Sequence, residues 1–238
     1  MNKTIDIIIP VFNEGKNILK TLESIFDNVS YNFNVLICYD FDNDDTLKEI
    51  NNSKFNKLDN IIFVKNKFRG PHSAVMTGIK KTKSDLILVM PADDDYNAKL
   101  IDKMINLSNE KKLEIVCPSR FINGISLEGA SLTKKILVIT ANYCLKKFAK
   151  LPVHDSTNGF RLFSKKIINN ITIESSFGFT YSIEYLVKAH RYGYKIGEIP
   201  AIWKERKFGK SRFKIIKWIL PYMRWFLYAF YTSLKKNK

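Results

Sequence analysis

Residues 85–100 read "DLILVMPADDDYNAKL". An apolar run with the length of a buried strand leads into Asp93, Asp94 and Asp95, and a segment with helical character follows. Neighbouring carboxylates repel one another, so a ligand or a local structure has to offset their charge. Two interpretations stay open: the triplet holds a metal ion, or it forms a solvated loop that caps the next helix.

Three earlier stretches share the character of this apolar run: "IDIIIPVF", "FNVLICYD" and "NIIFVKN". They are rich in Ile, Val and Leu without alternation, which is typical of parallel strands covered on both faces. Helical patterns separate them, with Ile18, Leu22 and Ile25 on one face of the first, and "PHSAVMTGIKKT" and "NAKLIDKMINLSNE" predict two more helices. The sequence therefore predicts an α/β fold with an open, mostly parallel sheet and helices on both faces.

Charge divides the 238 residues into two unlike halves. Residues 1–131 hold 17 Lys and Arg against 18 Asp and Glu, whereas residues 132–238 hold 22 against 5. A basic half of this kind favours polyanions such as nucleic acid, anionic lipid headgroups or phosphorylated substrates. Because no nucleic-acid-binding module is visible, we expect no nucleic acid partner. The three cysteines lack metal or redox spacing and no export signal is visible, so we expect reduced thiols in the cytoplasm.

The predicted strands end in polar residues, where ligands bind to an open parallel sheet. Neither G-x-G-x-x-G nor the phosphate loop G-x-x-x-x-G-K-[ST] occurs, which disfavours a dinucleotide dehydrogenase and a P-loop enzyme. The acidic strand ends suit a ribose, a base and a metal-held diphosphate instead.

These motifs together resemble a known family. The stretches "IIIPVFNEGKNI" and "RGPHSAVMTGI", an aspartate after the second strand and the acidic triplet are similar to family 2 glycosyltransferases of the Rossmann-like GT-A fold. The later "DSTNGFRLF" and "WKERKFGKSRF" resemble the branch that includes dolichol-phosphate mannose synthase. The resemblance extends from residue 5 to about residue 215.

The resemblance implies a GDP- or UDP-sugar donor held by a loop after each strand. Its expected nucleotide-sugar-binding residues are Pro10, Phe12, Glu14, Asp40, Arg69, Gly70, Ala92 and Asp93. The family writes its metal site as Asp-x-Asp with a further oxygen ligand two residues on. Here Pro91 stands at the first aspartate, Asp93 at the second and Asp95 at the later ligand. We therefore expect Asp93 and Asp95 to hold Mg²⁺ or Mn²⁺, with Asp93 also catalytic.

The basic half matches the positions that the family uses for phosphate and acceptor. The expected phosphate-binding residues are Arg120, Lys134, Arg206, Ser211 and Arg212, and Asp155 and Arg206 are expected to be catalytic. Asp155 would orient the acceptor or act as a base. A phosphate acceptor is already ionised near neutral pH, whereas a sugar hydroxyl would need a base.

Two segments of the basic half bear on membrane contact. Residues 132–149 predict a basic amphipathic helix, which suits a membrane surface or packing on the sheet. We expect residues 1–212 to form the GT-A domain and residues 213–238, rich in Trp, Tyr and Lys, to form an amphipathic helix at the membrane interface. A C-terminal helix packed on protein is the alternative. The expected location is the cytoplasmic face of the cytoplasmic membrane, peripheral or monotopic, facing anionic lipid.

The leading functional prediction is transfer of a sugar, with inversion, from a nucleotide-sugar to undecaprenyl or dolichyl phosphate. One alternative is transfer to the hydroxyl of a glycan or of a lipid-linked saccharide. Another is a non-catalytic, membrane-bound nucleotide-binding protein, since Pro91 and Tyr39 depart from the family's acidic pattern.

Overall fold

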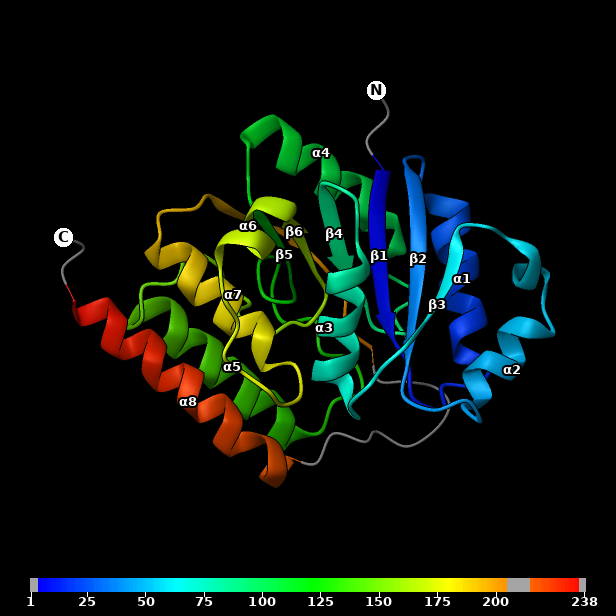
Figure 1. Ribbon diagram of the computed structural model, residues 1–238. Coiled ribbons are helices and arrows are strands. Elements are labelled where there is room, and N and C mark those ends of the chain that lie inside the picture. The colour runs from blue at the N-terminus through cyan, green and yellow to red at the C-terminus, as the bar shows by residue number, and fades with distance from the viewer. Residues whose placement is uncertain (1–3, 205–214, 236–238) are drawn as a thin grey trace.

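A seven-stranded sheet organises the chain, and the computed structural model describes residues 4–204 and 215–235 of it (Figure 1). The strand order is β3-β2-β1-β4-β6-β5-β7, and β6 runs antiparallel to both of its neighbours. The strands are β1 (Thr4–Pro10), β2 (Asn32–Tyr39), β3 (Ile61–Lys65), β4 (Leu86–Val89), β5 (Ile115–Ser119), β6 (Arg161–Ser164) and β7 (Ile196–Pro200).

Helices cover both faces of this sheet. They are α1 (Asn17–Asn28), α2 (Asp45–Asn51), α3 (Pro71–Lys81), α4 (Ile101–Lys111), α5 (Leu132–Lys147), α6 (Lys165–Asn170), α7 (Thr180–Arg191) and α8 (Ile215–Leu234), with short 3₁₀ turns η1 (Lys54–Lys57) and η2 (Ala98–Leu100). One core cluster joins the sheet to α1, α2 and α4, and the other joins it to α3, α6, α7 and α8. The predicted open α/β sheet with helices on both faces is confirmed.

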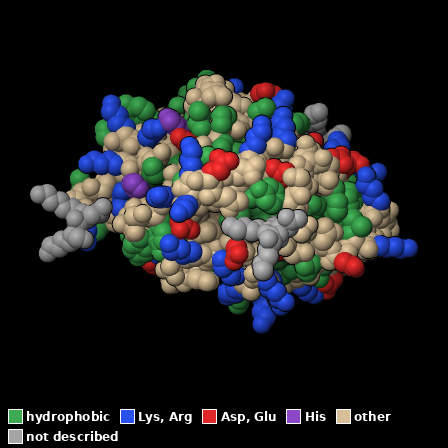
Figure 2. Space-filling view, turned by 90° about the horizontal axis from the view of Figure 1, so that it is seen from above, with side chains coloured by type: hydrophobic (Ala, Val, Ile, Leu, Met, Phe, Trp, Pro, Cys, Tyr) green, Lys and Arg blue, Asp and Glu red, His purple; other side chains and the backbone are tan. Residues whose placement is uncertain are grey.

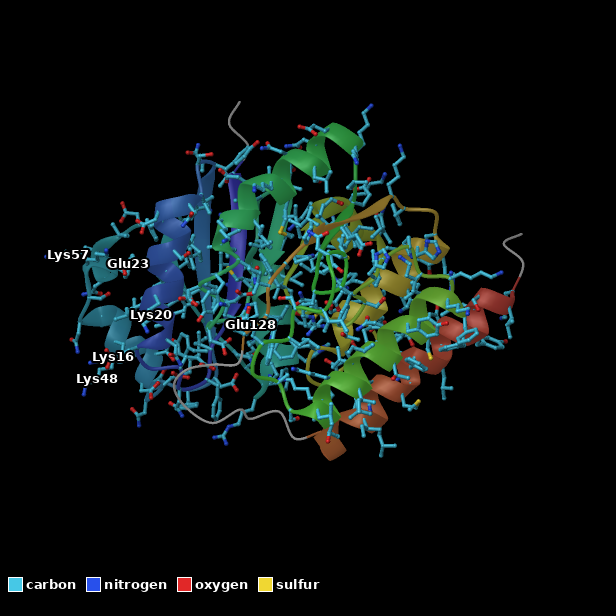
Figure 3. The ribbon with its side chains drawn as sticks, turned by 180° about the vertical axis from the view of Figure 1, so that it is seen from behind. Lys16, Lys20, Glu23, Lys48, Lys57 and Glu128 are labelled. Atoms are coloured by element: carbon cyan, nitrogen blue, oxygen red, sulfur yellow. The ribbon has the colours of Figure 1, made fainter. Side chains whose placement is uncertain are left out.

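The alternation of β1 explains why both clusters form. Ile5, Ile7 and Ile9 belong to the cluster beneath α1, whereas Ile8 packs on the opposite face with α3. On α1, Ile18 and Leu22 are completely buried, while Lys20 and Glu23 lie on the outer side of the helix (Figure 3). A strand that buries both faces requires the unbroken apolar pattern seen in the sequence.

The four predicted strands correspond to β1–β4, and the sequence pattern did not predict β5, β6 and β7. The sheet continues past β4 through the short strand β6, which pairs with β4 from Leu86↔Ser164 to Val89↔Arg161 and runs in the opposite direction.

The surface of the molecule seen from above Figure 1 carries interspersed acidic and basic side chains (Figure 2).

The C-terminal helix α8 packs on the domain through one side. Trp225 and Ala229 are buried against the core that contains α7, whereas Leu220 is 78% exposed on the outer side. Helix α5 lies alongside α8 (Figure 1) and also turns apolar side chains outward. Among the described residues, no helix has the length and apolar character needed to cross a membrane.

Candidate active site

The parallel strands β1–β4 end at the same edge of the sheet, so the loops that follow them form one rim. Because β6 is reversed, the segment that precedes it lies at this rim as well. The rim therefore gathers the β1–α1 loop, Asp40, the acidic triplet and the segment that contains Asp155. The topology brings together most of the residues that the sequence predicted for the donor and the acceptor.

The loop after β1 is fastened to the loop after β2. The backbone N–H of Asn13 donates to both carboxylate oxygens of Asp44 at 3.0 Å, and the N–H of Gly15 donates to Asp45 at 2.9 Å. Asp44 also caps α2 by accepting from Thr46 N at 2.9 Å. This arrangement leaves Phe12 43% exposed, with its ring edge-on to Phe41 at 5.4 Å. A half-exposed aromatic ring at this rim suits contact with a flat base.

Asp40 is held in place from two sides. Its Oδ2 accepts the N–H of Gly70 at 2.8 Å, and its Oδ1 accepts from Asn66 Nδ2 at 2.9 Å. Gly70 has φ = +105°, a conformation that a side chain strains, so glycine is required there. Asn66 is buried, and its Oδ1 accepts from the hydroxyls of Ser73 and Thr77. The two predicted donor-binding residues Asp40 and Gly70 thus form one unit, next to the exposed Arg69.

The three carboxylates of the acidic triplet have different roles. Asp94 accepts from Asn97 Nδ2 at 2.8 and 2.9 Å and from Asn97 N at 3.2 Å. Burial of its carboxyl, together with the charges of Asp93 and Asp95, raises the pKa of Asp94 to about 7 despite the Asn97 hydrogen bonds, which lower it. Asp94 therefore takes the local structural role that was one of the two interpretations.

Helix α1 supports the acidic loop from behind. Thr21 Oγ1 donates to the carbonyl of Ala92 at 2.7 Å, and Ser24 Oγ donates to the carbonyl of Asp95 at 2.7 Å. The carboxylate of Asp95 makes no hydrogen bond or ion pair with the part of the chain that the structure describes. The loop is thus fixed through its backbone, and the Asp95 carboxylate is left to meet a ligand.

A divalent cation fits this loop only with help from a substrate. Within residues 4–204 and 215–235, no three His, Cys, Asp or Glu side chains gather in a metal-binding group. Mg²⁺ and Mn²⁺ typically take one or two carboxylates and complete their coordination with phosphate oxygens and water. Asp93 and Asp95 match that donor set, and Pro91, at the position of the family's first aspartate, supplies no side-chain oxygen.

Arg120 and Asp155 form a buried pair. Arg120 Nε lies 2.6 Å from Asp155 Oδ2 and Nη2 lies 2.8 Å from Oδ1, while the carboxylate is completely buried. Burial would raise the pKa of Asp155, but the charge and hydrogen bonds of Arg120 outweigh it and hold that pKa below its usual range. Thr157 N and Oγ1 also donate to Oδ1. The carboxylate is therefore ionised and fully engaged, and Arg120, predicted to bind phosphate, is committed mainly to Asp155.

The segment 202–204 is fixed on two sides. Two hydrogen bonds join the backbone of Ile202 to the side chain of Asn97. Asn97 Nδ2 donates to the Ile202 carbonyl at 2.7 Å, and the Ile202 N–H donates to Asn97 Oδ1 at 3.2 Å. On the other side, Lys134 Nζ lies 4.0 Å from the ring centroid of Trp203, whose carbonyl accepts from Glu128 N at 3.0 Å. The acidic loop and the start of α5 are thereby joined through this segment. The predicted residues Arg206, Ser211 and Arg212 lie outside the described residues.

Asn66 and Asn97 are the site residues that sequence reasoning missed. Asn66 ends the quoted run "NIIFVKN", and an amide at the carboxyl end of a parallel strand is a signal that would have identified it. For Asn97 no local signal exists, because its partner Ile202 is 105 positions away.

Comparison with known proteins places this geometry in context. The sequence model of the family described as Glycosyl transferase family 2 matches residues 6–172. A dolichol-phosphate mannosyltransferase of Pyrococcus furiosus is 27% identical over 225 residues, which cover 92% of this chain and 62% of that protein. The uncharacterized protein MJ1222 of Methanocaldococcus jannaschii is 28% identical and is matched over 87% of this chain and 84% of its own length. The chain thus spans about three fifths of the Pyrococcus protein.

Solved structures support the fold. Glucosyl-3-phosphoglycerate synthase of Mycobacterium tuberculosis, in complex with Mn²⁺, UDP-glucose and phosphoglyceric acid, superposes with a TM-score of 0.73 at 14% identity, over 99% of this chain and 82% of that one. A complex of the same enzyme with Mg²⁺ and UDP gives a TM-score of 0.68 at 14% identity, over 97% and 79% of the two chains. At this identity the likeness establishes the architecture.

Proposed function

The chain belongs to glycosyl transferase family 2, and we propose from that premise that it transfers a sugar from a nucleotide-sugar to a polyprenyl phosphate with inversion of the anomeric carbon. It is a glycosyltransferase with the GT-A fold. The divalent metal and the polyprenyl phosphate acceptor are proposed in addition to the family membership.

The observation that carries the proposal is the engagement of Asp155. Transfer to a hydroxyl requires a base to take the proton of the attacking oxygen, whereas a phosphate acceptor arrives ionised. Among the described residues, the hydrogen bonds to the Asp155 carboxylate come from Arg120 and Thr157, and this carboxylate is completely buried. Because the Asp155 carboxylate is buried and bonded to Arg120 and Thr157, it is poorly placed to accept a proton from an acceptor hydroxyl. This favours an acceptor that needs no base.

The donor would lie across the rim of β1, β2 and β4. Phe12 offers an exposed ring, and Asp40, fixed by Asn66 and Gly70, presents a carboxylate at the end of β2. We assign base contact to Phe12, with Pro10, Glu14 and Arg69 nearby in the same two loops, and hydroxyl or base contact to Asp40. The backbone of Ala92, supported by Thr21, would border the sugar.

Asp93 and Asp95 would hold Mg²⁺ or Mn²⁺ beside the donor diphosphate. A divalent cation supplies Lewis-acid stabilisation of the negative charge that develops on the departing diphosphate. The role of the chain's own residues is to keep these carboxylates at the rim, which α1 does through its hydrogen bonds to Ala92 and Asp95. Lys134 would contribute positive charge on the acceptor side, whereas the charge of Arg120 is compensated by Asp155.

A polyprenyl acceptor requires access to a membrane, and the outer face of α5 and α8 supports such access. Its apolar side chains are at least about two fifths exposed: Leu132, Ile136, Leu137 and Tyr143 on α5, Phe148 at the C-cap of α5, and Ile219, Leu220, Met223, Leu227, Tyr231 and Leu234 on α8. We call these residues the α5–α8 face. Four lysines at the ends of α5 accompany it: Lys134, Lys135, Lys146 and Lys147. An apolar face bordered by lysines suits the headgroup boundary of a bilayer.

Direct transfer tests the proposal. The full chain is incubated with Mg²⁺ or Mn²⁺, a panel of GDP- and UDP-sugars, and either a polyprenyl phosphate in detergent or a soluble sugar hydroxyl acceptor. We expect product with the polyprenyl phosphate and loss of at least about a hundredfold in rate for Asp93→Asn. Transfer only to the hydroxyl acceptor would replace the proposal with its hydroxyl alternative. Donor binding without transfer to either acceptor would favour a non-catalytic protein.

A further inference from the structure

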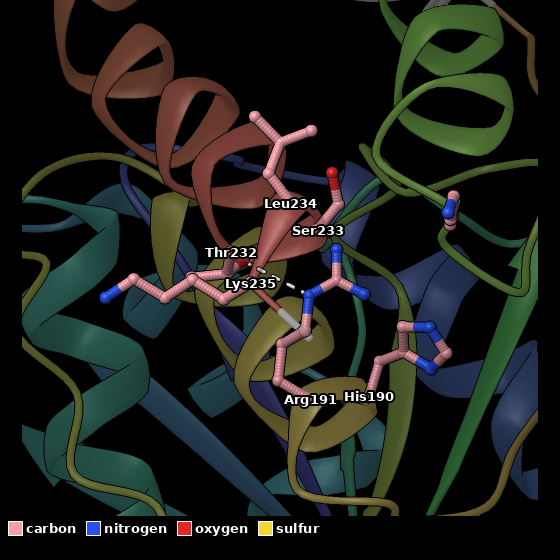
Figure 4. Close-up of a pocket in the computed structure, with 7 residues that line it drawn as sticks. His190, Arg191, Thr232, Ser233, Leu234 and Lys235 are labelled. Atoms are coloured by element: carbon pink, nitrogen blue, oxygen red, sulfur yellow. Dashed lines mark hydrogen bonds between the residues drawn. The ribbon is translucent and has the colours of Figure 1, made fainter. Parts of the chain in front are cut away.

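A pocket of about 440 Å³ lies at the C-terminal end of α8, away from the rim just described. It is lined by the end of α7, a residue three positions after α5 and the C-terminal end of α8: Lys150, His190, Arg191, Thr232, Ser233, Leu234 and Lys235 (Figure 4). Pockets of a few hundred Å³ are large enough for small ligands. None of these residues belongs to the predicted donor or acceptor site.

The charge of this pocket is one-sided. Lys150, Arg191 and Lys235 carry permanent positive charge, and no carboxylate lines the pocket among the described residues. None of the three forms an ion pair with the part of the chain that is described. Cations elsewhere in the same half do have such partners, for example Lys188 with Glu184 and Arg224 with Glu174. The positive charge of the pocket is therefore left for an external anion to neutralise.

Arg191 is positioned as a fixed donor. Its Nη2 donates to the carbonyls of Ala149 at 2.5 Å and Ala229 at 3.0 Å, and its Nε donates to Thr232 Oγ1 at 3.1 Å (Figure 4). These bonds hold the guanidinium between α5, α7 and α8, while Nη1 has no hydrogen-bond partner among the described residues. A guanidinium fixed on one side and open on the other is suited to bind a phosphate oxygen.

His190 lies beside the positive charge of Arg191 and is partly buried. Burial lowers the pKa of His190, and the charge of Arg191 lowers it further. In Figure 4 its ring lies on one side of Arg191, and the Lys235 side chain extends on the other. An anion bound beside Arg191 would thus have several nitrogen donors around it.

The surroundings of the pocket indicate the kind of molecule that carries the anion. Leu234, one of its lining residues, is 84% exposed, and Tyr231 and Phe148 beside it belong to the α5–α8 face. A cationic pocket at the end of an exposed apolar face combines the two features of a phospholipid, a phosphate and an acyl region. We propose that this pocket is a binding site for a phosphate ester, separate from the sugar-transfer site.

The test compares two doubly substituted full-length chains with the same change of charge. One is Lys150→Glu with Lys235→Glu in the pocket, and the other is Lys48→Glu with Lys57→Glu at the far end of the molecule (Figure 3). Lys150 keeps a side chain at its φ of +55° in either case, so no new backbone strain is introduced. Lys235→Glu alone serves as a milder variant if the pair lowers the thermal stability.

Two measurements distinguish the source of the phosphate, and neither depends on sugar transfer. Co-sedimentation uses vesicles of phosphatidylcholine with and without phosphatidylglycerol, and thermal stabilisation uses glycerol 3-phosphate. If the ligand is a lipid headgroup, the pocket variant should bind the anionic vesicles at least about tenfold more weakly than the far-end control. If the ligand is soluble, the same difference should appear in the glycerol 3-phosphate titration. Equal behaviour of the two variants in both measurements would overturn the proposal.

Discussion

Arg120 binds the carboxylate of Asp155 with two parallel hydrogen bonds, Nε to Oδ2 at 2.6 Å and Nη2 to Oδ1 at 2.8 Å. Both side chains are almost completely withdrawn from water. The pair joins the end of β5 to the segment that precedes β6, so it fixes this part of the rim. Its integrity should therefore affect stability and catalysis together.

Asp155→Asn should lower the free energy of unfolding by about 3–5 kcal/mol, because it leaves the Arg120 charge buried without a counter-charge. Urea denaturation measures this loss. The double variant Arg120→Met with Asp155→Leu should recover much of it, since it removes both charges at once. An Asp155→Asn protein as stable as the parent would show that Arg120 finds another partner or water.

Asn97→Ala should separate the acidic loop from residues 202–204. The Asn97 side chain is buried and bonds both Asp94 and the backbone of Ile202, so its removal should cost about 1–3 kcal/mol. We also expect a lower kcat, because Asp93 and Asp95 lose part of their support. Lys99→Ala, an exposed change in the same segment, is the control and should alter neither quantity. Equal effects of the two substitutions would contradict the linkage.

His72 should make the protein sensitive to mild acid. Burial lowers the pKa of His72, partly opposed by the charge of Glu184, so the unfolded chain binds a proton at a higher pH than the folded chain does. Stability is then fully present above the unfolded pKa, near 6.5, and falls as pH drops below it. His72→Phe keeps the ring contact with Tyr181 and removes a buried Nδ1 that has no hydrogen-bond partner among the described residues.

Denaturation at about pH 7.5 and about pH 5.5 therefore measures the contribution of His72 as a difference between parent and variant. The parent should lose more stability between the two pH values than His72→Phe does. If the parent and His72→Phe lose the same amount of stability, His72 does not cause the acid sensitivity. His190, whose pKa is also lowered by burial, would then be the next residue to test.

Gly78→Ala should destabilise the fold through overpacking. A Cβ at Gly78 would lie 2.8 Å from Cys38 Sγ and 2.8 Å from Ile8 Cγ2, which are core atoms of β2 and β1. Insertion of a methyl group into a packed core typically costs about 1–3 kcal/mol, and thermal denaturation should show it. Gly159→Ala is the matched control, because its Cβ would meet Phe179 at 3.6 Å, an ordinary contact. If both alanine variants are as stable as the parent, the core between β1 and α3 can accommodate an added methyl group, and the prediction is wrong.

The sequence predicted the donor half of the fold well because that half is built from local patterns. Each of β1–β4 is an apolar run of its own, and Asp40 and the acidic triplet follow directly from where those runs end. The acceptor half depends on distant partners. Strand β6 has four residues and is defined by pairing with β4, and Asn97 is defined by Ile202. The sequence likewise does not predict which side chains pair. It therefore did not predict that the Asp155 carboxylate is bound by Arg120.

The reversed strand β6 also dictates an order of events during synthesis. The strands β1–β4 lie within residues 4–89 and are complete before β6 is made, whereas β5 pairs, among the described strands, with β6 and β7. The open edge of β4 and the unpaired β5 must therefore wait until residues 161–164 have been made. A chain interrupted before that point would expose two hydrogen-bonding edges, and such edges are where nascent proteins associate wrongly.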